Sequence, residues 1–375
     1  MTFLPRFVCI SPYTVFCGLS FTMQLCCLGL HLSDSLRISD RIRDTEKLLL
    51  HIFLISSALY LAKFGRNWNE IFQAIKILEK RTTRIEDPKK LVKLIDTITL
   101  WGLFLFSLEI GLHLLFAIED TKLCSDHNNI TLKLFWNKFF ITNHRHYFSY
   151  LPNTVFVGFT LEFLKTQIKF WDYAMNVFII INGIYLAKQL GHLNMIMARR
   201  LQENKGNRMT WINIQMQYTT LCKLVKQVDS FLNPIVFFLY IYNLINTCKS
   251  IHELLEFKGL YKMNKGASCK QVNSSNIIAN VYKFYITLIS LVKTVGVVLI
   301  GGKLNDLTLE PLDALQEANT SAYGVELQRF MDQVYHSRVG LSGFGCFIIT
   351  RSSLLQIISA IITYELMLIQ LLDVD

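Results

Sequence analysis

Long apolar runs recur along the chain and are separated by shorter polar segments. A helix needs roughly 20 residues to cross a hydrocarbon core of about 30 Å. Seven runs meet or approach this length, and each is predicted to form a membrane helix. They cover residues 7–32, 48–64, 94–117, 170–190, 231–249, 281–302 and 345–372. The pattern predicts an all-α integral membrane protein, with a single seven-helix transmembrane domain over residues 1–375.

Two apolar stretches leave alternatives open. Residues 147–161 are apolar up to Glu162, and we interpret them as the outer part of the fourth helix or its lead-in, with an eighth span as the alternative. The first run follows Arg6, as in a signal peptide. Its apolar stretch is longer than the roughly 7–15 residues of a signal-peptide core, so we retain it as a membrane helix.

Composition supports a membrane protein. The chain is 52% hydrophobic and 18% charged, with a mean hydropathy of +0.34, whereas soluble domains carry about 25% charged residues. The net charge of +10 comes from basic residues between the apolar runs. At those positions they meet anionic lipid headgroups, so the charge does not indicate nucleic-acid binding.

Cysteine and histidine spacing gives no indication of a metal site or cofactor. The nine cysteines include no CxxC pair, and no spacing typical of zinc is present. His144 and His146 are two residues apart, so they would lie on opposite sides of a helix. No clustered acid–base constellation suggests an enzyme. Cys124, Cys248 and Cys269 are expected in polar loops, where one disulfide could form on the outer side.

Orientation rests on loop charges and glycosylation sequons. Residues 63–93 hold nine Lys and Arg residues in a short loop, which favours the cytoplasmic side. The sequons begin at Asn129, Asn273 and Asn319. A cytoplasmic N-terminus places Asn129 and Asn273 outside, and these two are the predicted glycosylation sites. We therefore predict a cytoplasmic N-terminus and an extracellular C-terminus.

A polar stripe runs along the last predicted helix. Its members are spaced four, three, four and seven residues apart, so they share one face of the helix. They are Ser352, Gln356, Ser359, Thr363 and Gln370. Such a stripe lines a water-filled pathway or packs against other helices, and periodicity alone leaves both open. Glu365 favours a functional role, because a carboxylate inside a membrane is costly.

The C-terminal sequence resembles insect gustatory receptors, and in particular their sugar-receptor branch. TYELMLIQL (363–371) is similar to the family signature of Thr-Tyr, five hydrophobic residues and Gln-Phe. The matching motif residues are Thr363, Tyr364, Glu365 and Gln370, and Glu after Thr-Tyr resembles the sugar branch. VELQRFMDQV (325–334) and VGLSG (339–343) are similar to blocks before the last helix of sugar receptors. Weaker likeness covers 170–190, 224–245 and 284–306.

The resemblance implies a channel. Members have the fold of insect odorant receptors, with seven helices, a cytoplasmic N-terminus and four subunits around one pore. This chain would then be a ligand-gated, non-selective cation channel subunit in the plasma membrane of a chemosensory neuron, as a homo- or heterotetramer. The residues that would line or gate the pore are Gln356, Ser359, Thr363, Gln370 and Leu371. Leu371 replaces the usual Phe, and it still supplies a hydrophobic plug.

The resemblance also implies an outward-facing sugar pocket among the middle helices. Aromatic platforms combined with carboxylates and amides suit a small polar ligand. The candidates are Glu109, Trp171, Asp172, Asn176, Tyr242, Asn243, Tyr282 and Tyr285, and His113 lies one turn from Glu109. Each aromatic also has a plain explanation, because Trp and Tyr are enriched at every membrane interface.

Other interpretations remain beside this one. A G-protein-coupled receptor would carry Asp/Glu-Arg-Tyr after its third helix, and NPIVF (233–237) lacks the Tyr of the related motif. A transporter would show internal repeats, and none is visible. Within the family, the alternatives are a subunit for a non-sugar ligand, an obligate heteromer partner, or a truncated non-functional product. The last is considered because only six residues precede the first predicted helix.

Overall fold

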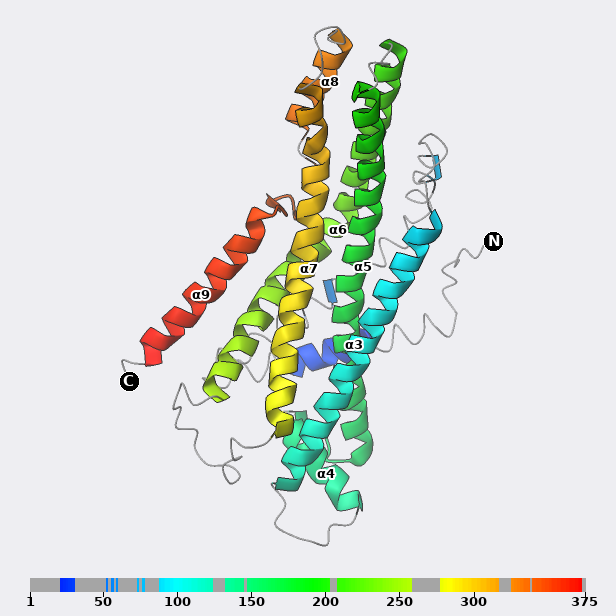
Figure 1. The fold of residues 1–375 in the computed structure, drawn as a ribbon. Helices are drawn as coiled ribbons and strands as arrows, with labels where there is room; N and C mark the ends of the chain where they lie inside the picture. The colour runs from blue at the N-terminus through cyan, green and yellow to red at the C-terminus, as the bar shows by residue number, and fades with distance from the viewer. Residues whose placement is uncertain are drawn as a thin grey trace. The chain divides into compact units, whose positions relative to one another are not determined.

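The structure is a computed structural model of the 375-residue chain. It describes residues 21–30, 88–123, 132–144, 147–202, 208–257, 277–316, 325–337 and 339–372, together with seven isolated positions between 52 and 77. The described chain is almost entirely helical (Figure 1).

Four helices are long and apolar enough to cross a membrane: α3 (Pro88–Leu123), α5 (Val155–Gln202), α6 (Arg208–Phe257) and α7 (Ile277–Gln316). At 1.5 Å per residue, the 50 residues of α6 measure roughly 75 Å. A hydrocarbon core is about 30 Å thick, so part of this helix lies beyond the lipid tails.

The remaining described elements are short. They are Phe21–Leu30, α4 (Leu132–Asn143), the 3-10 helix η1 (Tyr147–Ser149), α8 (Val325–His336), β1 (Ser342–Gly343), β2 (Phe347–Ile348) and α9 (Ser352–Leu372). Residues 21–30 and most of α9 form shorter apolar helices.

The four long helices contain the predicted runs 94–117, 170–190, 231–249 and 281–302 and extend beyond each. The stretch 147–161 holds η1 and the first residues of α5, so no separate spanning helix lies there. Of the first predicted run only residues 21–30 are described, and the run 48–64 lies outside the described residues apart from isolated positions. The count of seven spans stays a prediction.

The last helix begins at Ser352, and the predicted start at residue 345 was too early. The preceding residues form an antiparallel hairpin in which Ser342 pairs with Ile348. Its turn requires positive φ values, 50° at Phe344 and 71° at Gly345, which a helix does not contain. The Thr350 N–H then donates to Ser353 Oγ at 3.1 Å, as in a helix capping box.

The prediction for Cys248 was also wrong. This residue is buried in α6 and forms no disulfide, rather than lying in a polar loop, so it behaves as a small, largely apolar side chain. Cys124 and Cys269 lie outside the described residues, as do the sequon asparagines Asn129 and Asn273.

The chain divides into two compact units. One comprises Met1–Ala58, Trp101–Ala174 and Tyr242–Leu291, and the other comprises Leu59–Leu100, Met175–Ile241 and Val292–Asp375. Each of the four long helices contributes residues to both units. We call them the first and the second unit.

An aromatic cluster forms the core of the first unit. Phe139 and Phe140 of α4 are buried, and the ring of Trp136 stacks on that of Phe140 with centroids 5.8 Å apart. Phe159 of α5 meets the Phe140 ring edge-on at 4.8 Å. A Cβ at Gly158 would overlap the Phe140 ring, so α5 approaches α4 closely at a residue without a side chain.

In the second unit, α8 and the hairpin pack on α6 and α7. Leu327, Phe330 and Val334 form the buried side of α8. Tyr218 of α6 is fully buried, packs edge-on against Phe330 and donates to the carbonyl oxygen of Thr308 at 2.8 Å. These contacts fix the segment that leads into α9.

Candidate functional site

A stripe of polar and ionisable side chains lies on the part of α5 that belongs to the first unit. Glu162, Lys165, Lys169 and Tyr173 are spaced three, four and four residues apart, so they share one side of the helix. Charged groups inside a membrane segment are costly, and they are a functional-site hypothesis by default.

The C-terminal end of this stripe, formed by Lys169 and Tyr173, binds Glu109 of α3. Lys169 Nζ lies 2.8 Å from Glu109 Oε1, and the Tyr173 hydroxyl donates to Glu109 Oε2 at 2.7 Å. Both carboxylate oxygens are therefore held by side chains of α5. Glu109 and Tyr173 are buried, where a charge-assisted hydrogen bond is stronger than in water.

The N-terminal end of the stripe, formed by Glu162 and Lys165, binds two histidines. His113 of α3 lies one turn from Glu109, and its Nε2 is 2.9 Å from Lys165 Nζ. Its Nδ1 is 3.6 Å from Glu162 Oε1, and the other Glu162 oxygen lies 2.8 Å from His144 Nε2. A lysine ammonium only donates. His113 Nε2 therefore accepts from Lys165, and its Nδ1 carries the proton that faces Glu162.

Aromatic residues of α7 cover this network. Tyr282 is buried and stacks on Phe116 with ring centroids 5.2 Å apart. Its ring meets His113 edge-on at 5.8 Å, and Lys169 Nζ lies 6.0 Å from its centroid, within cation–π range. The Tyr285 hydroxyl donates to the carbonyl oxygen of Leu105 at 2.7 Å. Three helices thus contribute to one polar, aromatic cluster.

The chemistry of the cluster suits recognition of a polyhydroxylated ligand. Carboxylates accept hydrogen bonds from hydroxyl groups and ammonium groups donate to them, while tyrosine does both. Aromatic faces next to them fit the apolar side of a sugar ring.

The structure brings three predicted ligand-binding residues into the cluster: Glu109, Tyr282 and Tyr285. Trp171 is half-buried and Asp172 is buried, on the α5 turn between Lys169 and Tyr173. On α6 of the same unit, Tyr242 is half-buried and Asn243 is buried. Asn176 is buried as well, but it belongs to the second unit.

Sequence reasoning missed Glu162, Lys165, Lys169, Tyr173 and His144 as site residues. The signal was present in the three, four, four spacing on α5. It was overlooked because the fourth span was predicted to begin at residue 170, which left Glu162, Lys165 and Lys169 outside the helix. The pair of His144 with Glu162 also had no local sequence signal, because α4 and α5 are joined by a turn whose path only the fold defines.

The predicted pore-lining side chains of α9 lie on its uncovered side. Gln356, Ser359, Thr363 and Gln370 are all exposed, and Thr363 Oγ1 donates to the Ser359 carbonyl oxygen at 2.8 Å. The buried side carries Ser353, Ile357, Ile361 and Glu365 at steps of four. The side chain of Leu371 lies outside the described residues.

The apolar residues of α9 are only partly buried. Ile357 and Ile361 are buried, whereas Ile358 and Ile362 are 46% and 53% exposed. Only a narrow band of α9 therefore packs against described residues of its own chain.

The described fold is that of an insect olfactory receptor. The chain aligns with the olfactory receptor OR5 from Machilis hrabei in complex with eugenol at a TM-score of 0.65, over 99% of this chain and 93% of that one. A second OR5 structure aligns at a TM-score of 0.61 over 96% and 90%. Sequence identity is 10% and 12%, so this likeness concerns the fold alone.

The family follows from the sequence comparison. The model of the trehalose receptor family matches residues 5–374, and the chain belongs to this family of insect gustatory receptors. It is 27% identical over 327 residues to the Drosophila melanogaster gustatory receptor for sugar taste 61a, covering 82% of this chain and 68% of the relative. The receptor for sugar taste 64f is 25% identical over 366 residues, with coverage of 95% and 72%. The expected resemblance to sugar receptors is confirmed, and the family consists of chemosensory receptors rather than enzymes.

Proposed function

We propose that this chain is a subunit of a sugar-gated, non-selective cation channel in the plasma membrane of a chemosensory cell. The observation that carries the proposal is the cluster around Glu109, Lys169, Tyr173 and Tyr282, in which charged and hydroxyl groups are embedded in apolar helices. A relative named as a receptor for trehalose, 25% identical over 201 residues and covering 53% of this chain and 41% of its own, supports a sugar as the ligand class.

The proposed orientation has a cytoplasmic N-terminus and an extracellular C-terminus. It places the segment 63–93, with its nine basic residues, on the cytoplasmic side. The following helix α3 then runs outward, and Glu109 and His113 lie towards its extracellular end. The cluster would therefore be reached from outside the cell, as a taste ligand requires.

The proposed pore is lined by the polar stripe of α9, with Gln370 and Leu371 at the extracellular constriction. Four copies, identical or mixed with related subunits, would surround it. A stripe of amides and hydroxyls binds water and partly hydrated cations without trapping them. Sugar opens such a pore only if it binds the open state more tightly than the closed state.

The test is whole-cell current in heterologous cells that express this chain alone, challenged with a panel of mono- and disaccharides. A sugar-evoked cation current is the expected result. Tyr282→Ala removes the aromatic face that Phe116 stacks on, and it should raise the half-maximal sugar concentration by roughly tenfold. Tyr335→Ala is the matched control, because Tyr335 is 67% exposed on α8.

Gln370→Ala addresses the gate separately. It should change the leak current or the steepness of gating while leaving the order of preference among the sugars unchanged, because the ligand contacts are retained. A surface-expressed chain without current would contradict a homomeric sugar channel. Recovery of the current on co-expression with a related receptor would then identify this chain as a heteromer partner.

A further inference from the structure

A pocket of about 670 Å³ lies in the second unit, between the first turns of α3, the middle of α5 and the second half of α7. It is far along the chain from the cluster, since Lys188 follows Lys169 by 19 residues of α5. About 20 helical residues cross a hydrocarbon core. The pocket shares no lining residue with the cluster, so it is a separate site.

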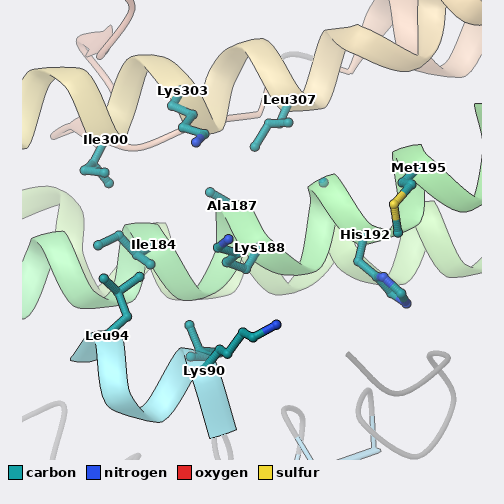
Figure 2. Close-up of a pocket in the computed structure, with 12 residues that line it drawn as sticks. Lys90, Leu94, Ile184, Ala187, Lys188, His192, Met195, Ile300, Lys303 and Leu307 are labelled. Atoms are coloured by element: carbon teal, nitrogen blue, oxygen red, sulfur yellow. The ribbon is translucent and has the colours of Figure 1, made fainter. Parts of the chain in front are cut away.

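The pocket combines basic groups with an apolar wall. Three lysines, one from each helix, and one histidine line it: Lys90, Lys188, Lys303 and His192. Figure 2 shows the side chains of Lys90 and Lys303 extending from α3 and α7 towards the side of α5 that carries Lys188. Apolar side chains form the rest of the wall, among them Leu94, Ile184, Met195, Ile300 and Leu307.

No carboxylate is among the described residues that line the pocket. The two acidic residues of α7 that are nearest in sequence to Lys303 are engaged elsewhere. Asp306 Oδ2 lies 2.5 Å from Arg351 Nε, and Glu310 Oε2 accepts from Asn194 at 2.7 Å. Within the part of the chain that the structure describes, Lys188 and Lys303 make no hydrogen bond or ion pair. The positive charge in the pocket is therefore not balanced by a carboxylate in its wall.

We propose that this pocket binds a phospholipid whose headgroup carries a phosphate monoester. A phosphate monoester has a charge of about −1.5 to −2 near pH 7, and the phosphodiester of the same lipid adds another negative charge. The ammonium groups of Lys188 and Lys303 supply matching positive charge from two helices, and Lys90 of a third helix lines the same pocket. The apolar wall then accommodates the glycerol and the first methylenes of the acyl chains, for which a free phosphate compound has no equivalent.

The location agrees with a lipid site. Lys90 lies in the first turn of α3, near the end of the basic segment 63–93. Basic residues at a membrane boundary attract anionic lipid headgroups. In the proposed orientation this boundary is the cytoplasmic leaflet. Lysines at that boundary ordinarily extend separately into the headgroup region, whereas these three line one pocket that also has an apolar wall.

The experiment measures lipid retention by the purified full-length chain. The protein is incorporated into phosphatidylcholine vesicles that contain equal amounts of phosphatidylserine and phosphatidylinositol 4,5-bisphosphate. It is then extracted, and the bound lipids are identified by native mass spectrometry. We expect the bisphosphate lipid to be retained in preference to phosphatidylserine by about tenfold or more. Equal retention of both lipids would overturn the headgroup assignment.

Lys188→Gln with Lys303→Gln is the test variant. It should lower retention of the bisphosphate lipid by roughly tenfold or more, because two of the positive charges that line the pocket are removed. Lys223→Gln with Lys226→Gln is the matched control, since both lysines are exposed on α6 of the same unit and lie outside the pocket lining. An equal loss in both variants would show diffuse attraction by net charge and refute a specific site.

Two further measurements separate lipid from soluble phosphate and from misfolding. Soluble inositol 1,4,5-trisphosphate should displace the lipid only weakly, and displacement at equal concentration would show that the acyl chains contribute nothing. Met195→Gln makes the apolar wall polar at a 41% exposed position, and it should lower lipid retention without changing the elution volume of the protein. None of these outcomes depends on a sugar response, so the lipid site is tested independently of the proposed channel function.

Discussion

At the scale of single residues, the buried contact between Lys169 and Glu109 determines how the candidate site is held together. The carboxylate is bound on both oxygens, by Lys169 at 2.8 Å and Tyr173 at 2.7 Å. Glu109→Gln keeps the shape but removes the negative charge, so it leaves a partly buried ammonium group without its counter-charge. Breaking a buried pair in this way costs roughly 3–5 kcal/mol. We expect a clearly lower unfolding temperature in detergent, measured by fluorescence-detected size-exclusion chromatography after heating.

A double-mutant cycle tests whether charge is the cause. Glu109→Gln combined with Lys169→Met should recover much of the loss, because neither charge then remains. Glu326→Gln is the control. Glu326 pairs with Arg329 at 3.8 Å, one turn further along α8, and the arginine side chain is 69% exposed. Surface pairs of this kind contribute about 0–1 kcal/mol. A double variant as unstable as the sum of the two single variants would contradict the pairing.

At the scale of elements, the hairpin before α9 is fixed by α6 (Figure 1). Asp229 accepts from the Ser342 backbone N–H and from its hydroxyl, both at 2.6 Å. The Phe344 ring packs edge-on against Phe237 with centroids 5.1 Å apart. Asp229→Ala leaves the buried N–H of Ser342 without this partner, at a cost of about 1–3 kcal/mol. It should lower the unfolding temperature and, because the start of α9 is loosened, raise the current measured without sugar.

Ser230→Ala is the neighbouring control, because the Ser230 hydroxyl only donates to the Gln227 carbonyl oxygen of its own helix. It should leave both the unfolding temperature and the resting current unchanged. A Gly302→Ala variant provides a second route to the same junction, since a Cβ there would lie 2.9 Å from the Arg351 backbone nitrogen. If the resting current responds to neither Asp229→Ala nor Gly302→Ala, the hairpin does not control α9.

The same elements show what a sequence predicts and what it leaves undetermined. Hydropathy located four long helices, because apolar length is a local property that lipid imposes directly. It did not place the start of α9, which depends on a turn with positive φ at Phe344 and Gly345. The sequence marked Glu109 as a candidate ligand-binding residue but did not indicate its partner Lys169, 60 residues away. Such pairs arise only when two helices pack in a particular register.

At the scale of the whole molecule, most of the surface of α9 is left uncovered by the described residues of its own chain. Its polar stripe is exposed, and so are the adjoining apolar residues Leu355, Ile358, Ile362, Leu366 and Met367. Apolar side chains meet lipid or another subunit without cost, but a stripe of amides and hydroxyls in a membrane needs water or a polar partner. The proposed assembly around a central pore satisfies the stripe with water and the apolar residues with neighbours or lipid.

Cysteine substitution distinguishes this arrangement from ordinary helix packing. A positively charged, membrane-impermeant thiol reagent should block the sugar-evoked current of Gln356→Cys, Ser359→Cys and Thr363→Cys, because each new thiol would face the water-filled path. Ile358→Cys and Ile362→Cys should be unaffected, although they are equally exposed in the single chain. The unsubstituted protein, which already carries the exposed thiol of Cys346, is the control. Block at the isoleucine positions but not at the stripe would place the apolar residues that adjoin the stripe, rather than the stripe itself, on the pore.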